Sequence, residues 1–250
     1  MELSGKVALV TGAAKRLGRA IALTLAEGGA DIVLHVNASS GEDLVREIEA
    51  LGRQAWIVRA DLSRAAAACR LSQAVLTLAG HVDILVNNAA IFFPTSLSAL
   101  TVRTWRTVLC INLTAPFVLS LLLGRAMCAH GTGKIIQLGD WSGLRPLPGY
   151  LPYCVSKGGL VALTQVLAKA LAPQVQVNGV APGPVLPPDH YTAGERQTLI
   201  VHTPLGRLGQ ATDVARAVHF LVTAGDFATG AVYLVDGGRL VRASEGMSTS

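Results

Sequence analysis

Short runs of β-branched and apolar residues alternate with stretches of helical periodicity, and this alternation constrains the fold more than any other feature of the sequence. Apolar runs without a polar face are typical of strands that are covered on both sides, as in a parallel sheet between two layers of helices. Right-handed crossovers favour a doubly wound arrangement of such strands. We therefore predict an α/β fold, a single doubly wound Rossmann-type domain with a seven-stranded parallel sheet flanked by helices. The expected strands are Lys6–Thr11, Asp31–Val36, Gln54–Arg59, Val82–Asn87, Lys134–Leu138, Val175–Val180 and Ala231–Val235.

The organisation of the chain also favours one domain. A length of 250 residues suits a single unit of this kind, and no internal repeat divides it. Glycine and proline commonly end helices. A glycine pair therefore ends one expected helix, Arg16–Gly28, and Pro173 follows the end of another, Val155–Ala172. The segment 182–207 contains five prolines and no sustained period, so we expect a substrate loop there. We expect the domain to span residues 1–240 and a polar tail to occupy residues 241–250.

Composition and charge exclude two classes of protein. Apolar residues make up 51% of the chain and charged residues only 15%, which provides for a large core and excludes extended disorder. The net charge of +5 comes from basic residues that are scattered along the chain. A protein that binds nucleic acid should gather them in a patch or stripe, so we predict no nucleic-acid partner.

Nothing in the sequence predicts export, a membrane span or a metal site. The opening residues lack the basic start and the apolar region of a secretory signal. The longest apolar stretch, Ala115–Leu123, is interrupted by Ser120 and is far shorter than the roughly 20 residues of a membrane span. We therefore expect a cytoplasmic protein without membrane contact, whose four cysteines remain thiols. The histidines show no metal-ligand spacing and we assign a role to none of them: His35, His81, His130, His190, His202 and His219.

A glycine-containing turn, Thr11–Gly18, follows the first expected strand and leads directly into a helix. Gly12 and Gly18 permit a tight turn and the close approach of a pyrophosphate, while the helix amino terminus supplies N–H groups and partial positive charge. This position, after a strand and before a helix, favours a dinucleotide site. The alternative is an ordinary strand–helix turn of an unrelated α/β protein.

The choice of dinucleotide depends on the end of the second strand. A carboxylate at that point would hold the 2′-hydroxyl of NAD and repel a 2′-phosphate, but none occurs before Glu42. Arg16 and the hydroxyls of Ser39 and Ser40 are natural partners of a phosphate. We therefore predict NADPH as the cofactor. The alternative for Arg16 is a solvated residue in the first helical turn.

Tyr153 and Lys157 lie four residues apart at the start of a helical pattern, so both project from one face of the helix. A cation beside a phenol favours the phenolate and lowers the pKa of the phenol from about 10. The pair is therefore a candidate proton donor to a carbonyl or imine that receives a hydride. The alternative is a solvated surface pair, which is common on helices.

Five motifs, in order, make the sequence resemble the short-chain dehydrogenase/reductase family from about Ser4 to Gly238. They are the Gly12-x-x-x-Arg16-x-Gly18 turn, Asp61-Leu62, Asn87-Asn88-Ala89, Tyr153-x-x-x-Lys157 and Pro182-Gly183. The resemblance implies that Asp61 and Leu62 border the adenine. It also implies that Asn88 and Ala89 line the cofactor cleft and that Pro182 and Gly183 flank the nicotinamide. The residues expected to bind the cofactor are Gly12, Arg16, Leu17, Gly18, Ser39, Asp61, Leu62, Asn88, Ala89, Tyr153, Lys157, Pro182 and Gly183.

The same resemblance assigns further roles near the reacting atoms. It implies that Asn112 holds a water leading to Lys157, and that Lys157 binds the hydroxyls of the nicotinamide ribose. Two departures from the commonest family pattern resemble its pteridine reductase branch. These are Arg16 in place of a glycine, and Asp140 in place of a serine thirteen positions before Tyr153.

In that branch an aspartate pairs with the active-site tyrosine, and an aromatic residue, here Phe92, stacks on the pterin. The match is incomplete, because Ala38 stands where the branch often has a basic residue, and Ala90 and Val185 stand where it tends to carry hydroxyls. These differences leave the fit of the cofactor phosphates and of the substrate open.

The chemistry of a pterin agrees with the two departures. A pterin presents several ring nitrogens and an amino group, and Asp140 could accept from these donors or share a proton with Tyr153. Phe92 and the nicotinamide could form two faces of a slot for a flat ring, and Arg16 could donate to its acceptor edge. The alternatives are Phe92 as core filler, Asp140 as a turn residue capping Ser142, and Ser142 as the catalytic hydroxyl.

We therefore expect an NADPH-dependent reductase of a pteridine, of the dihydropterin or dihydrofolate type. Hydride would go to a ring C=N, with a proton relay of Tyr153, Asp140 and Lys157, supported by Asn112. Two alternatives remain: an NADPH-dependent carbonyl or β-ketoacyl reductase of the same family, and a catalytically silent dinucleotide sensor. The apolar helices Asn112–His130 and Val155–Ala172 exceed what one sheet face needs, and the resemblance suggests that they pair in a homotetramer.

Overall fold

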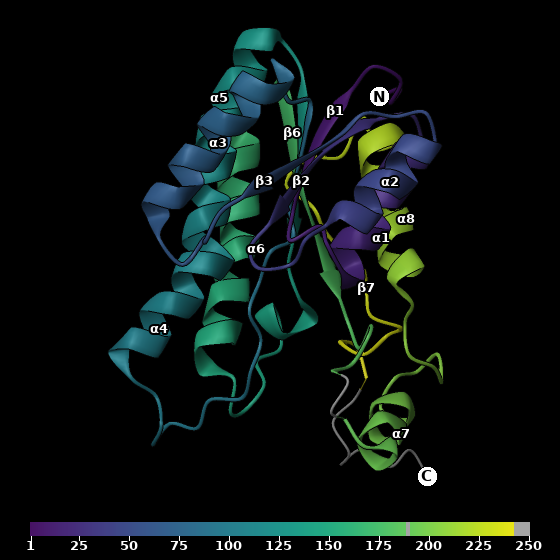
Figure 1. Ribbon diagram of the computed structural model, residues 1–250. Helices are drawn as coiled ribbons and strands as arrows, with labels where there is room; N and C mark the ends of the chain where they lie inside the picture. Colours follow the sequence, from purple (N-terminus) through teal and green to yellow (C-terminus); the bar gives the residue numbers. More distant parts are fainter. Residues whose placement is uncertain (189–190, 243–250) are drawn as a thin grey trace.

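A parallel sheet with strand order β3-β2-β1-β4-β5-β6-β7 crosses the middle of the molecule (Figure 1). The structure is a computed structural model, and it describes residues 1–188 and 191–242, which contain all seven of these strands. The strand order reverses between β1 and β4, which opens a crevice at the carboxyl ends of these two strands. The strands are β1(Val7–Thr11), β2(Asp31–Val36), β3(Ala55–Arg59), β4(Ile84–Asn87), β5(Gly133–Leu138), β6(Val175–Pro182) and β7(Val232–Val235).

The central strands are apolar on both faces because helices cover both sides of the sheet. Strand β1 is buried along its whole length, and successive side chains point to opposite faces. Val10 thus packs in one core cluster with Ile21 and Leu25, whereas Leu9 packs in the other with Leu71. The continuous apolar runs in the sequence are explained by this two-sided burial.

The helices form one layer on each face (Figure 1). One layer contains α1(Arg16–Glu27), α2(Glu42–Ala50) and α8(Ala211–Thr223). The other contains α3(Ala65–Ala79), α4(Val102–Leu109), α5(Ala115–His130) and α6(Leu151–Leu171), with a π-helical turn, η1(Cys110–Thr114), between α4 and α5. A short 3-10 turn, η2(Trp141–Gly143), follows β5, and α7(Ala193–Val201) lies beyond the carboxyl end of the sheet.

The predicted fold and strands are confirmed, but two helices differ from the prediction. Helix α6 begins at Leu151, four residues before Val155, because Pro152 is compatible with a first helical turn. The proline-rich segment 182–207 contains the helix α7, which the sequence analysis did not predict. The side chains of Thr192 and Glu195 form a capping box at its start, and this Thr-x-x-Glu pattern is readable in the sequence. Most of the expected tail lies outside the described residues.

Two helical segments are longer and more apolar than the sequence analysis allowed. The continuous helical stretch Val102–His130 and the helix Leu151–Leu171 reach mean hydropathies of 2.0 and 1.2, enough for a membrane span by length and composition alone. A buried core helix passes the same test, and Leu119, Leu123 and Leu167 of these segments belong to the core. The absence of membrane contact stays a prediction.

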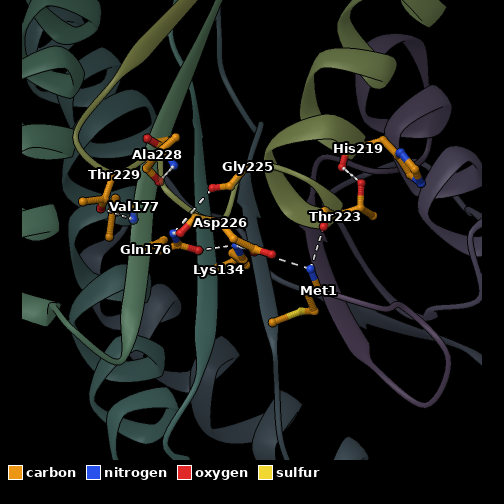
Figure 2. Close-up of polar contacts among 11 residues, drawn as sticks. Met1, Lys134, Gln176, Val177, His219, Thr223, Gly225, Asp226, Ala228 and Thr229 are labelled. Atoms are coloured by element: carbon orange, nitrogen blue, oxygen red, sulfur yellow. Dashed lines mark hydrogen bonds and ion pairs between the residues drawn. The ribbon is translucent and has the colours of Figure 1, made fainter.

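A polar network joins segments at the amino ends of the strands, as Figure 2 shows. The Lys134 ammonium, almost fully buried at the start of β5, donates to Asp226 Oδ1 at 2.7 Å and to the Gln176 side chain. The amino group of Met1 donates to the carbonyl of Thr223 at 2.6 Å and lies 3.5 Å from Asp226 Oδ1. These contacts tie the amino terminus of the chain and the loop before β7 to strands β5 and β6.

Candidate active site

A cavity of about 370 Å³ lies at the carboxyl ends of β1, β2 and β4, where the strand order reverses. Its size falls within the range of ligand pockets, roughly 300–1,000 Å³. Most of the residues predicted to bind the dinucleotide line it: Gly12, Arg16, Leu17, Gly18, Ser39, Asp61, Leu62, Asn88 and Ala89. Pro182 and Gly183 are not part of this lining, and neither are Tyr153 and Lys157.

The glycines of the turn are required by close packing. Gly12 has a φ of 65°, and a Cβ on Gly18 would lie only 2.2 Å from the carbonyl oxygen of Gly12. Asn88 holds the same turn from β4, because its Nδ2 donates to the Thr11 carbonyl at 2.8 Å. The Thr11 hydroxyl in return accepts from the N–H groups of Asn88 and Ala89. Asn88 is therefore committed to shaping the turn.

The turn suits a pyrophosphate. Helix α1 begins without a side-chain cap at Lys15 and without an acidic residue in its first turn. No side chain at the cap and no acidic residue in the first turn therefore competes for its first N–H groups, and uncapped helix amino termini bind phosphates. The donor set of this cavity fits the dinucleotide that the sequence predicts.

The region for a 2′-phosphate differs in detail from the prediction. Ser39 lines the cavity, and the exposed Arg59 fixes the loop behind it by donating to the carbonyls of Ser39 and Ser40. Lys15, which the sequence analysis passed over, also lines the cavity and supplies a second cation beside Arg16. The sequence analysis gave Lys15 no role because the family resemblance rested on Arg16, the next residue.

Arg16 lies at the cavity but makes its hydrogen bond elsewhere. Its guanidinium donates to the carbonyl of Leu186 in the segment 182–207, not to Ser39 or Ser40. Among the described residues that are not glycine, only Arg16 and Leu186 have positive φ, at 55° and 50°. Such conformations cost an L-residue about 1–2 kcal/mol each. The glycine turn and the segment 182–207 thus meet through a pair of strained residues.

The predicted pairing of Asp140 with Tyr153 is present. Tyr153 lies in the first turn of α6, and its hydroxyl donates to Asp140 Oδ2 at 3.0 Å. Asp140 Oδ1 accepts from the N–H of Ser142 at 2.8 Å, so the carboxylate also caps η2, as the alternative interpretation proposed. The Ser142 hydroxyl is fully buried and has no partner among the described residues, a position that does not suit a hydroxyl acting on substrate.

The pKa of Tyr153 is opposite to the expectation. The Lys157 ammonium lies 5.7 Å from the centre of the Tyr153 ring, but burial and the adjacent Asp140 raise the pKa of Tyr153 well above 10. A carboxylate in direct contact with the hydroxyl outweighs a cation over the ring. The prediction of a lowered phenol pKa is therefore wrong for the protein without ligand.

Lys157 is buried without a contacting carboxylate. Its Nζ donates to the carbonyl of Leu138 at 2.6 Å, and burial lowers its pKa to about 8, although Asp140 acts in the opposite direction. An ammonium with this pKa changes its charge close to neutral pH. Lys157 is therefore placed to respond to a proton that leaves or enters Tyr153.

Asn112 lies in the π-helical turn η1, and such turns are frequent at functional sites. Its amide group accepts from the Ile91 N–H at 2.9 Å and donates to the Ile91 carbonyl at 3.0 Å. It also donates to the Ser156 hydroxyl at 3.2 Å. Asn112 thereby connects the loop after β4 to α6, beside Lys157. A water held by Asn112 stays a prediction.

Phe92 is an exposed aromatic residue of the site, so the core-filler alternative is wrong. Its ring is 41% exposed, stacks on Tyr150 at 4.6 Å between centroids, and meets the edge of Tyr153 at 4.8 Å. Tyr150, absent from the sequence-based site, covers one face of Phe92. A flat substrate would therefore have to use the remaining face or displace Tyr150.

The ring of Trp141 lies against Arg239, whose guanidinium carbon is 5.1 Å from the centre of the ring.

The remaining expectations concern Gly183, the cysteines and the histidines. A Cβ on Gly183 would lie 2.6 Å from Asp236, so a glycine is needed there for packing. The four cysteines are free thiols, and the described residues contain no group of three or more potential metal ligands. His35 lines the cavity at the carboxyl ends of β1, β2 and β4, although the sequence analysis gave it no role.

Comparisons with known proteins agree with this geometry. Residues 12–239 match a family described as Enoyl-(Acyl carrier protein) reductase. The chain is 34% identical to a 3-oxoacyl-[acyl-carrier-protein] reductase of Synechocystis, covering 96% of this chain and 98% of that protein. It is 33% identical to the enzyme of the same name from Haemophilus influenzae, over 94% and 98%. A blue fluorescent protein from a metagenomic library, solved in complex with NADPH, is 34% identical, with a TM-score of 0.89 and coverage of 96% and 99%.

Proposed function

Because the chain belongs to the short-chain dehydrogenase/reductase family, we propose that it is an NADPH-dependent carbonyl reductase whose substrates are β-ketoacyl groups. The observation that carries this proposal is the 34% identity, over 96% of this chain, to a protein named as a 3-oxoacyl reductase. The buried Tyr153 and Lys157 on one face of α6 supply the proton chemistry that such a reduction needs. The proposal replaces the pteridine reductase expected from the sequence as the leading function.

NADPH, when bound, supplies the hydride that reduces the carbonyl carbon. Tyr153 then gives its proton to the oxygen that becomes negatively charged. Its raised pKa keeps the phenol protonated until that oxygen is strongly basic, since an alkoxide is a stronger base than a phenolate. Lys157, 5.7 Å from the ring centre, stabilises the phenolate that remains beside Asp140.

NADPH is favoured over NADH by charge and by the absence of a carboxylate. The cavity wall at the end of β2 consists of Val36, Asn37, Ala38 and Ser39, none of which would repel a 2′-phosphate. Lys15 and Arg16 add cations to the same cavity. Comparing the dissociation constants of NADPH and NADH by nicotinamide fluorescence tests this choice. Equal or tighter binding of NADH contradicts it.

A pteridine reductase is the second candidate, and the contact between Asp140 and Tyr153 favours it. A carboxylate cannot donate to a ketone oxygen, whereas it can accept from the N–H groups of a pterin. The exposed Phe92 beside Tyr153 offers a stacking surface for such a ring.

One panel of assays separates these functions. Acetoacetyl-coenzyme A and a dihydropterin are reduced with NADPH by the wild type, by Asp140→Ser and by Tyr153→Phe. We expect thioester turnover in the wild type, the same or faster turnover in Asp140→Ser, and loss of turnover in Tyr153→Phe with NADPH binding retained. Pterin turnover that Asp140→Ser abolishes would establish the second candidate. Tight NADPH binding without turnover of any substrate would point to a silent sensor.

We also propose a homotetramer built by the apolar helices. Phe117 of α5 and Val155 and Val166 of α6 are exposed in the single chain, between 42% and 64%. Covering them in a second copy would remove apolar surface from water. Light scattering of the purified protein measures the number of chains, and a monomer would contradict the proposal.

A further inference from the structure

The imidazole of His35 connects the glycine turn to the end of a neighbouring strand. His35 lies near the end of β2, pairs with Thr11 of β1, and is only 2% exposed. Its Nδ1 lies 3.2 Å from the backbone N of Gly12, and its Nε2 lies 3.0 Å from the carbonyl oxygen of Ala60. Both ring nitrogens are therefore engaged with main-chain atoms on either side of β2.

The polarity of these partners determines where the proton of the ring resides. The N–H of Gly12 can only donate, so Nδ1 of His35 must be an unprotonated acceptor. The carbonyl of Ala60 can only accept, so Nε2 must carry the hydrogen. Burial also lowers the pKa of His35, which favours this neutral form.

The peptide of Gly12 is held on its other side by β4. The side-chain amide of Asn88 donates to the Gly12 carbonyl at 3.3 Å, while His35 accepts from the Gly12 N–H. The two strands that flank β1 thus fix both polar groups of one glycine residue. Because Gly18 packs against the Gly12 carbonyl, the position of Gly12 also sets the start of α1.

We propose that His35, as its neutral Nε2–H tautomer, is a positioning residue that presets the glycine turn for the dinucleotide pyrophosphate. It acts through Gly12 and takes no part in the hydride or proton transfer. The inference requires only that the cavity binds a dinucleotide, and it is independent of the carbonyl substrate proposed above.

Protonation of His35 would remove its hydrogen bond to the Gly12 N–H. A charged imidazole presents an N–H to the Gly12 N–H, and two donors cannot pair, so the turn loses its contact with β2. The charged groups of the flanking segments are Lys15 and Arg16 of the turn, Arg59 at the end of β3 and Asp61 after it. The hydrogen bonds of Arg16, Arg59 and Asp61 go to groups other than this ring.

Nitrogen NMR of the full chain labelled with ¹⁵N-histidine tests the tautomer without any activity measurement. At pH 7, we expect His35 to show an unprotonated Nδ1 and a protonated Nε2, and its loss in His35→Asn assigns the signal. A protonated Nδ1, in either the neutral or the charged ring, would overturn the proposal.

Two variants test the function of the contact, with His130→Asn as a matched control. His130 is exposed at the end of α5, at the amino end of the sheet. His35→Leu removes both hydrogen bonds, and we expect NADPH to bind at least tenfold more weakly, a change of about 1.4 kcal/mol. His35→Asn keeps an acceptor near the Nδ1 position and should lose less affinity. Turnover at saturating NADPH should change less than twofold in both.

The pH dependence of NADPH affinity provides a further readout. The 2′-phosphate of NADPH also titrates near pH 6, so the comparison is made between the wild type and His35→Asn rather than on the wild type alone. We expect the wild type to lose more affinity than His35→Asn as the pH falls through the lowered pKa of His35. Wild-type affinity in a folded His35→Leu would overturn the proposal. If His35→Leu does not fold, His35→Asn and the NMR measurement decide.

Discussion

Two lysines, Lys157 and Lys134, are buried to almost the same extent, 3% and 4% exposed, at opposite ends of strand β5. Lys134 is the second residue of the strand and forms an ion pair with Asp226 at 2.7 Å. Lys157, in α6, donates to the carbonyl of Leu138, the last residue of the same strand. A buried ammonium beside a carboxylate joins segments of the fold, whereas one beside a carbonyl keeps a proton that it can lose near neutral pH.

Replacing Lys157 by Met should have the largest effect of the changes considered, and the effect should be on activity. The variant loses the cation that stabilises the Tyr153 phenolate, so we expect kcat to fall by about 10²–10⁴-fold. Its free energy of unfolding should stay the same or rise, because an unpaired buried charge is removed. Steady-state kinetics and urea unfolding measure the two effects. Near-normal kcat would show that Lys157 is only structural.

Replacing Lys134 by Met should affect stability instead. The change removes the hydrogen bonds to Asp226 and Gln176, and we expect unfolding to become easier by about 1–3 kcal/mol. Asp226 is exposed, so its carboxylate remains solvated and adds no penalty for a stranded buried charge. Kinetics at 25 °C should be unchanged. A loss of kcat in the folded variant would contradict the conclusion that Lys134 contributes to stability and not to activity.

Raising the pH should move activity and stability in opposite directions. Lys157 has a pKa of about 8 in the folded chain and 10.5 as its ordinary value. Activity should decline above pH 8 as the ammonium is lost. Between pH 8 and 10.5, however, the unfolded chain binds more protons at this residue, so its contribution to stability becomes more favourable as the pH rises. The measurement is the difference between wild type and Lys157→Met in kcat and in urea unfolding across this range.

The smallest effect is expected for Asp226→Asn. The Lys134 ammonium holds the pKa of Asp226 below its usual value, so the ion pair stabilises the fold above that range and loses its effect as the pH falls through the lowered pKa. We expect the melting temperature to drop slightly at pH 7, with the difference from wild type shrinking in acid. A difference that is independent of pH would show that the ion pair contributes nothing.

The sheet was predictable because burial on both faces requires continuous apolar runs, as in β1. The helix α7 was missed because the prolines around it dominate the local signal, although its Thr192 and Glu195 capping pattern is legible. Most residues that line the cavity were identified from motifs, since glycines and small residues mark close approach of the backbone.

Charge and hydrogen bonding in the site were harder to predict. The spacing of Tyr153 and Lys157 indicates that a cation is near the phenol, but its pKa depends on burial and on Asp140, which comes from a different segment and contacts the hydroxyl directly. His35 looks like any polar residue in an apolar strand. Its partners become visible only when the ends of β1 and β3 are set beside β2.

The hydrogen bond between Arg16 and the carbonyl of Leu186 links the glycine turn to the proline-rich segment 182–207. Each residue holds a backbone conformation that L-amino acids avoid, so this closed arrangement relies on support from its surroundings. A ligand that drew the Arg16 guanidinium toward itself would remove this support from the proline-rich segment. Binding at the glycine turn and the conformation of the segment around Leu186 would then change together, without a hinge between domains.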